Sequence, residues 1–196
     1  SGSSGSSGSS GDGGAQGKTR FVEDNVTRED AAEWDGSPIE IVATGVSVAV
    51  NGGLVVNADA NATKVKATAR MLAMASSADK AAADQTLTDA KATFTIANVG
   101  GTIKITCGHG NAHGTSSAAE SGCEKLTVTV PQGSAAKPLD IKMTSGNGNL
   151  ELGFAAASIK SLSASQAGGD ITASLAATKG GSITLVAESG GDITAT

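Results

Sequence analysis

The C-terminal part of the sequence repeats one short phrase three times, and this repeat constrains the fold more than any other feature. Two glycines, a small polar residue, isoleucine and threonine occur at residues 168–172, 180–184 and 190–194. Glycine pairs permit backbone dihedral angles that other residues avoid, whereas isoleucine and threonine favour strands. A turn-and-strand unit that recurs along the chain predicts coils that bury their apolar side chains only against neighbouring coils.

The interval between equivalent positions defines the size of one coil. Leu150, Ile171 and Ile193 each follow a glycine-containing turn, at intervals of 21 and 22 residues. Ile159 and Ile183 lie between them, 24 residues apart. Each coil of about 22 residues therefore holds two strands, represented by GGDITASLAAT and KGGSITLVAES. We predict an all-β fold, a β-solenoid or stacked β-sheet ladder.

The residues of the predicted turns have a structural role and, in two cases, a catalytic alternative. Asp170 and Asp192 fall in equivalent turns one coil apart, so their carboxylates could stack as a catalytic pair. Aspartate is also a common turn residue whose side chain binds the following backbone amides, and we favour that role. The structural turn residues are Asn51, Gly52, Gly53, Gly168, Gly169, Asp170, Gly180, Gly181, Gly190, Gly191 and Asp192.

The composition supports thin, closely stacked sheets. The 196 residues include one tryptophan, three phenylalanines and no tyrosine, so the small aliphatic residues cannot fill a wide interior. The net charge of −5 argues against nucleic acid or an anionic membrane surface as a partner. No apolar run approaches the ~20 residues that a transmembrane helix needs.

Composition divides the chain into three parts. Residues 1–17 are rich in serine and glycine, which predicts a disordered segment. This segment is either a cloning linker or a native tether that follows a lipid anchor upstream of residue 1. Residues 18–38 are the most charged part, and residues 39–196 are predicted to form a single β domain whose clearest repeats lie in residues 145–196.

One segment of this β domain departs from the strand pattern. The sequence SSADKAAADQTLTDA is rich in alanine and acidic residues and lacks a β-branched run at its start. We predict a single short helix at residues 78–90, capped by Ser77. Its apolar face would consist of Ala81, Ala82 and Leu87, which suits it to cover one end of the core.

A polar insert at residues 107–123 holds the only two cysteines. We predict that Cys107 and Cys123 form a disulfide, which would stabilise the fold by ~3 kcal/mol. Together with His109 and His113 they could in number make a zinc site, but their spacing matches no standard zinc motif. The glycine-rich loop would also not preorganise these ligands, so we predict no metal and no cofactor.

Several segments together resemble a known bacterial family. They are VSVAVNGGLVV, the helix followed by FTIANVGGTIKITC, and the series GNGNLEL, GGDITA, GGSITL and GGDITA, which span the chain from about Ile39 to Thr196. The chain resembles the bacterial candidate-adhesin domains, β-solenoid-like domains of unknown function with Gly-Asp-Ile repeats. The resemblance implies a β-solenoid-like fold, export in many members and no established reaction. The insert after Thr106 departs from the compact connection usual in that family.

These observations predict a non-enzymatic exported domain, adhesin-like or scaffold, that presents a flat β face to a protein partner or to the envelope. It would lie outside the cell or at the bacterial surface, as a mature form after removal of a signal. One alternative is a self-assembling subunit that stacks end to end into a filament or sheath, because an uncapped coil leaves backbone groups unpaired. A second alternative is a carbohydrate-active enzyme on a β-solenoid, for which we assign no catalytic residue.

Overall fold

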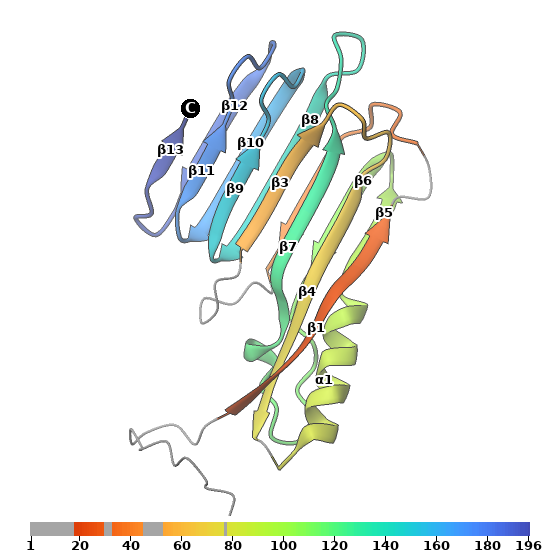
Figure 1. The fold of residues 1–196 in the computed structure, drawn as a ribbon, viewed down its shortest axis with the longest axis vertical. Coiled ribbons are helices and arrows are strands. Elements are labelled where there is room, and N and C mark those ends of the chain that lie inside the picture. Colours follow the sequence, from red (N-terminus) through yellow and green to blue (C-terminus); the bar gives the residue numbers. More distant parts are fainter. Residues whose placement is uncertain (1–17, 30–32, 45–52, 77) are drawn as a thin grey trace, which may run out of the picture.

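The computed structural model, which describes residues 18–29, 33–44, 53–76 and 78–196, consists of two facing β-sheets with one α-helix at one end (Figure 1). Sheet A has the strand order β1-β4-β7-β3-β9-β11-β13, and sheet B has the order β12-β10-β8-β2-β6-β5. The predicted all-β ladder is confirmed. The strands are β1 Lys18–Glu29, β2 Ile39–Ala43, β3 Gly53–Asp59, β4 Lys66–Ser76, β5 Thr95–Val99, β6 Thr102–Cys107, β7 Gly122–Pro131, β8 Leu139–Asn147, β9 Asn149–Gly153, β10 Ile159–Gly168, β11 Ile171–Ser174, β12 Ser182–Ala187 and β13 Ile193–Ala195; the helices are α1 Lys80–Ala92 and the short 3-10 helix η1 Ala118–Glu120.

Five pairs of consecutive strands form the coils of the ladder. Each coil gives one strand to sheet B and then one to sheet A: β2–β3, β6–β7, β8–β9, β10–β11 and β12–β13. Neighbouring coils pair in parallel, and Leu150, Ile171 and Ile193 lie side by side as the repeat predicts. At the end of the ladder opposite β12 and β13, the added strands are antiparallel. Strands β4 and β1 continue sheet A beyond β7, and β5 continues sheet B beyond β6. The coils do not follow chain order, because β2–β3 lies between β6–β7 and β8–β9.

The pairing in sheet B differs from the alignment that the sequence suggested. Ile183 lies beside Leu162 of β10, not beside Ile159. Strand β10 begins with an irregularity, because Ile159 pairs with Leu139 and the register then shifts before Ser161. The sequence aligned Ile159 with Ile183 because each is the first isoleucine after a turn. The strand register is set instead by which side chains point into the core.

The core between the sheets is built from rows of similar aliphatic side chains, one from each coil. Strand side chains alternate between the two faces of a sheet, so every second residue points inward. Stacked coils place equivalent inward residues about 4.8 Å apart, which packs small side chains closely. One buried row in each sheet is formed by Ile39, Ile103, Ile141 and Leu162 in sheet B, and by Leu54, Leu126, Leu150 and Ile171 in sheet A.

Helix α1 begins two residues later than predicted. Its N-cap is Asp79, whose side chain accepts a hydrogen bond from the backbone N–H of Ala82 at 3.3 Å; the predicted cap, Ser77, lies outside the described residues. Ala82 and Leu87 are buried as predicted, whereas Ala81 is exposed. The buried face of the helix is therefore rotated slightly from the predicted one. Its other buried residues are Ala83, Thr86 and Ala90.

The charged segment near the N-terminus supplies an additional strand. Strand β1 pairs antiparallel with β4, and ion pairs fix it there. Glu124 of β7 is 4% exposed and lies between Arg20 of β1 and Arg70 of β4, with 3.1 Å between Arg70 Nε and Glu124 Oε2. A buried carboxylate is tolerated when cations accompany it. The charges that set this segment apart in the sequence therefore join three strands.

The turns between coils approach one another so closely that they leave no room for a side chain at selected positions. Gly180 and Gly181 both have positive φ, +71° and +76°. A Cβ on Gly181 would lie 2.2 Å from the carbonyl oxygen of Ile159 in the neighbouring coil, whereas a Cβ on Gly180 would meet the same oxygen at 3.4 Å. Backbone conformation therefore favours glycine at both positions, and lack of space requires it only at Gly181.

This difference gives a test with a matched control. We expect Gly180→Ala to lower the free energy of unfolding by about 1 kcal/mol, the cost of a left-handed alanine. Gly181→Ala should lower it by roughly 1–3 kcal/mol more, because the coils must separate to admit the methyl group. Urea denaturation followed by circular dichroism measures both. Equal losses in the two variants would contradict the proposed close contact between coils.

Candidate functional site

The outer surface of sheet A carries an ordered array of polar side chains that we call the threonine face. The cross-strand register aligns one outward residue from each strand, so the array follows the whole width of the sheet. Strands lie ~4.8 Å apart, so a row of seven residues spans about 29 Å. The first row is Thr27, Thr68, Thr127, Val55, Glu151, Thr172 and Thr194, and the second is Glu29, Lys66, Thr129, Asn57, Gly153 and Ser174.

Strict alternation in the strands produces this face. In β7, Leu126, Val128 and Val130 point into the core, which leaves Thr127 and Thr129 on the outer surface. Threonine suits both needs, because its branched Cβ favours a strand and its hydroxyl both donates and accepts hydrogen bonds. The alternating threonines in KLTVTVP are a sequence signal for this face, but no single strand shows that its neighbours continue the rows.

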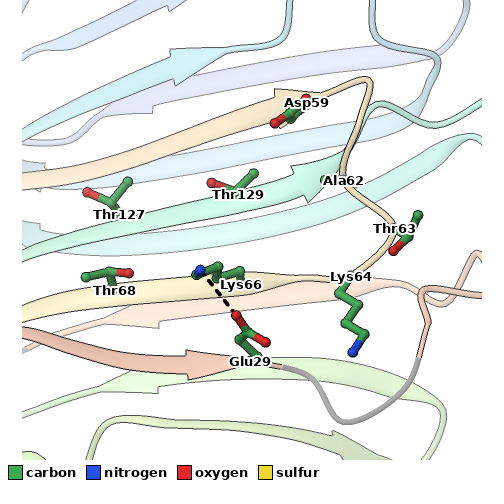
Figure 2. Close-up of a pocket in the computed structure, with 9 residues that line it drawn as sticks. All are labelled: Glu29, Asp59, Ala62, Thr63, Lys64, Lys66, Thr68, Thr127 and Thr129. Carbon is green, nitrogen blue, oxygen red and sulfur yellow. Dashed lines mark ion pairs between the residues drawn. The ribbon is translucent and has the colours of Figure 1, made fainter.

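One end of the threonine face is hollowed into an open groove of about 430 Å³ (Figure 2). Lys66 Nζ lies 3.2 Å from Glu29 Oε1 within it, and both side chains are about half exposed. A second hollow of about 240 Å³ lies farther along the same face, beside Glu151 and Thr172. Both hollows are open and lined by hydroxyls, and the first also carries both charges. Such surfaces suit a broad polar partner better than an enclosed small molecule. The groove is lined by Glu29, Asp59, Ala62, Thr63, Lys64, Lys66, Thr68, Thr127 and Thr129.

The two turn aspartates lie in equivalent turns one coil apart, and the side chain of Asp170 connects the two coils. Asp170 Oδ1 accepts a hydrogen bond from the backbone N–H of Asp192 at 2.9 Å. In the same way, Asn149 Oδ1 accepts one from the N–H of Asp170 at 3.2 Å. We expected each aspartate to bind amides of its own turn, but Asp170 and Asn149 bind the equivalent residue of the next coil. One oxygen of the exposed Asp170 carboxylate therefore makes a structural bond between coils.

Several of the glycines predicted in turns lie at close approaches between coils. Asn51 and Gly52 fall outside the described residues. Gly53 opens β3, and a Cβ there would lie 2.4 Å from the carbonyl oxygen of Asn149. Gly169 and Gly191 face carbonyl oxygens of the neighbouring turn, where a Cβ would lie 2.1 and 2.0 Å away. A Cβ on Gly168 would lie 3.0 Å from Asn147 Oδ1, whereas Gly190 has open space around it and a positive φ of +77°. Close contact between coils therefore requires glycine at positions 53, 169 and 191, and turn conformation favours it at position 190.

The polar insert is an ordered strap, residues 108–121, that packs along α1. Thr115 donates both its backbone N–H and its hydroxyl to Asp79 Oδ2, each at 2.9 Å. A Cβ on Gly110 would lie 2.4 Å from the carbonyl oxygen of Thr86, so the strap touches the helix backbone directly. The sequence suggested a flexible loop, because it could not show that a helix would lie alongside to accept these bonds.

The two histidines of the strap have separate partners. His109 Nδ1 lies 2.5 Å from the carbonyl oxygen of Ser121, and His113 Nε2 lies 2.7 Å from Asp89 Oδ2. The pKa of Asp89 is lowered, chiefly by its hydrogen bond with His113. Within the described part of the chain, no group of three or more histidine, cysteine, aspartate or glutamate side chains could hold a metal ion.

A disulfide between Cys107 and Cys123 joins the two sheets beneath the strap. Cys107 ends β6 in sheet B and Cys123 lies at the start of β7 in sheet A, with 6.0 Å between their Cα atoms. Both residues are buried, and the thioether sulfur of Met71 lies 3.9 and 3.8 Å from their sulfurs. The cross-link therefore closes the loop that the strap occupies.

Comparisons with known proteins place the chain in a domain family. Residues 54–196 match the family Toastrack DUF4097. None of the curated proteins matches the sequence. The crystal structure of a candidate cell adhesion protein from Clostridium sporogenes ATCC 15579 is similar over 91% of this chain and 95% of that chain, with 11% identity and a TM-score of 0.38. A similarity this distant carries no conclusion about function. In the described residues, no helix is long and apolar enough to span a membrane.

The disulfide gives the first prediction for this region. Replacing both cysteines, Cys107→Ala with Cys123→Ala, should lower the free energy of unfolding by about 3 kcal/mol, because the unfolded chain gains the freedom of an open loop. Urea denaturation under oxidising conditions measures the loss. The control Met71→Leu keeps the cross-link and should lose less than about 1.5 kcal/mol. A double variant as stable as the parent would contradict the structural role of the cross-link.

The attachment of the strap to α1 gives a prediction about pH. Hydrogen bonds from Thr115, and then from Ala82, hold the pKa of Asp79 below its ordinary value of 3.8. The stabilisation is therefore complete above that value and is lost as the pH falls through the lower pKa of the folded state. We expect amide hydrogen exchange in the strap to accelerate under these acidic conditions.

Two variants of α1 separate this effect from general acid denaturation. Asp79→Asn should loosen the strap already at neutral pH and remove the acid-dependent step in its exchange. Asp84→Asn, which loses only an exposed ion pair with Lys80, should keep that step. An unchanged acid-dependent step in Asp79→Asn would show that another group controls the strap.

Proposed function

This chain belongs to the Toastrack DUF4097 family, and we propose that it is an exported, non-enzymatic surface domain that binds a protein partner through the threonine face. The observation that carries this proposal is the cross-strand register of sheet A, which places mainly hydroxyl, amide and charged groups in one row across seven strands and a second row across six. Such a surface offers many hydrogen-bond partners at fixed positions on rigid strands.

The chemistry of the threonine face favours a protein over a sugar. Sugar-binding surfaces commonly use exposed aromatic rings, and the two rows contain none. Phe94 and Phe154 are each at most 1% exposed, in the core. Hydroxyl and amide groups beside ion pairs such as Lys66–Glu29 match the polar character of non-obligate protein interfaces. A flat protein surface is therefore the partner we propose.

The disulfide supports export. Disulfides persist in oxidising surroundings such as the bacterial periplasm and the cell surface. The Cys107–Cys123 bond is buried between the sheets and is part of the fold. We therefore place the domain outside the cytoplasm, and a lipid anchor upstream of residue 1 would hold it at the envelope, with the Ser/Gly-rich segment 1–17 as its tether.

The turn aspartates support a structural role over the enzymatic alternative. Catalysis by a carboxylate pair on this fold would need two side chains that are free to exchange protons with a substrate. Asp170 instead accepts the backbone N–H of Asp192 and links two coils. Of the two carboxylates that the sequence offered for chemistry, that of Asp170 thus helps to align the ladder.

Variants on the two outer faces test the proposal. Beads coated with the protein should capture specific components from an envelope preparation of the source organism. Thr127→Lys with Thr172→Lys, at exposed or half-buried positions of the threonine face, should reduce this capture at least tenfold, since two desolvated ammonium groups would oppose contact.

The matched control lies on the outer face of sheet B. Thr144→Lys with Ser163→Lys places the same two charges on outward positions of β8 and β10 and should leave capture unchanged. Equal capture by both double variants would overturn the threonine face as the binding surface. Far-ultraviolet circular dichroism of all proteins verifies that the variants fold.

A further inference from the structure

The last coil of the described chain exposes the apolar side chains that every other coil buries. Ile183 of β12 is 37% exposed and Ile193 of β13 is 46% exposed. Their neighbours in the same inward rows, Leu162 and Ile171, are at most 1% exposed. Val186, on the outer surface of β12, adds a third exposed apolar side chain, at 44%. The two-layered core therefore ends openly at this coil (Figure 1).

The backbone at this end is equally open. In a parallel sheet, alternate residues direct their N–H and C=O groups to opposite neighbours. Glu188 donates its N–H to Gln166 of β10, so the odd-numbered residues Ile183, Leu185 and Ala187 direct their groups away from β10. Within the described residues, no strand pairs with that edge of β12 or with the outer edge of β13.

The two ends of the ladder differ in how they resist pairing with another chain. Natural edge strands carry charges, prolines or bulges that discourage such pairing. Strand β1, at one edge of sheet A, is rich in charge and has a register irregularity between Glu23 and Val26. Strands β12, with the sequence SITLVA, and β13, with the sequence ITA, contain no charge and no proline. Strand β5, at the other edge of sheet B, has the sequence TIANV and is also uncharged. The β1–β5 end is therefore protected in sheet A, whereas the β12–β13 end lacks this protection in both sheets.

We infer that two copies of this chain associate through the β12–β13 end, around a two-fold axis normal to the sheets. This symmetry pairs β12 with β12 and β13 with β13 in antiparallel fashion, so one operation extends both sheets. With this pairing, inward-pointing residues of one copy lie opposite inward-pointing residues of the other. The second copy then covers the exposed parts of Ile183 and Ile193. Because each copy uses the same edge, the contact closes as a dimer and leaves the β1–β5 end free.

The symmetry has a consequence for binding, which rests on the proposed function. A two-fold axis normal to the sheets carries sheet A onto sheet A on the same side of the dimer. The two threonine faces would then form one surface of twice the length. Two linked faces bind a repetitive partner with greater avidity than either alone. The dimer thus deepens the role of the threonine face without adding a new site to it.

Molar mass in solution tests the inference without any partner. Light scattering coupled to size-exclusion chromatography should show a reversible dimer, with twice the 18.9 kDa mass of the chain, as the concentration rises. The contact involves two short strands per copy, so we expect a micromolar dissociation constant. Sedimentation velocity measures that constant.

Two variants of β12 and one at the opposite end identify the edge used. Ile183→Lys places a charge toward the open core, and Ala187→Pro removes an unpaired edge N–H; each should raise the dissociation constant at least tenfold. Val99→Lys, at a 52% exposed position of β5, should leave it unchanged. Thermal unfolding of the three variants verifies that each keeps the fold.

Two other results of the molar-mass measurements would overturn the proposed dimer. A monomer at every concentration overturns the inference. Open-ended oligomers that Val99→Lys abolishes would also overturn it, because they require the β5 end and indicate head-to-tail stacking. The bead assay tests the threonine face separately, since dense coating with a monomeric variant still presents many faces. Loss of capture together with an intact dimer would therefore refute only the proposed function.

Discussion

The structure depends on direct contact between the backbones of neighbouring coils. Gly169, Gly181 and Gly191 each face a carbonyl oxygen of the adjacent coil at a distance that excludes a Cβ. With glycine at these positions, the coils lie close enough for side chains to bridge them, as Asp170 does to Asp192. Close stacking also explains why a core with so few aromatic residues is filled, since small aliphatic residues pack well only between layers that are near one another.

Parallel register extends this local constraint across the molecule. Once the turns fix the stacking of coils, equivalent residues form rows on both faces of each sheet. The inward rows make the core, and the outward rows of sheet A make the threonine face. The surface that we propose for binding is therefore a consequence of the same geometry that builds the interior. Its rigidity comes from the ladder and not from the side chains themselves.

The two ends of the ladder have different construction, and this asymmetry shapes both proposals. At one end, β4, β1 and α1 extend the coils, the Cys107–Cys123 bond joins the sheets, and the strap packs along the helix. The buried carboxylate of Glu124 forms ion pairs with Arg20 of β1 and Arg70 of β4, and the first of these holds β1 in place. At the other end, the last coil leaves isoleucines and backbone groups uncovered. A two-fold contact at that end would leave the cross-linked end free in both copies.

Local sequence was sufficient for features that depend on neighbouring residues. The glycine pairs located the turns, and the repeat predicted that Leu150, Ile171 and Ile193 occupy equivalent positions of successive coils. The short helix was predicted within two residues at each end. The strap was not predicted as ordered, because its partners lie earlier in the chain. Asp79 accepts the N–H of Thr115, 36 residues away, and the hydroxyl of Thr93 accepts the N–H of Gly108, 15 residues away. The threonine face was missed for the same reason, since its rows join strands that are far apart in sequence.

The sequence by itself determined that this chain makes two-stranded coils, because turn conformation and strand alternation are local properties of a few adjacent residues. Only the tertiary structure decided the order in which the coils stack. The insertion of β2–β3 between β6–β7 and β8–β9, and the pairing of Ile183 with Leu162, follow from which inward surfaces fit together. A period of about 22 residues is compatible with several such arrangements, and packing between distant segments selects one of them.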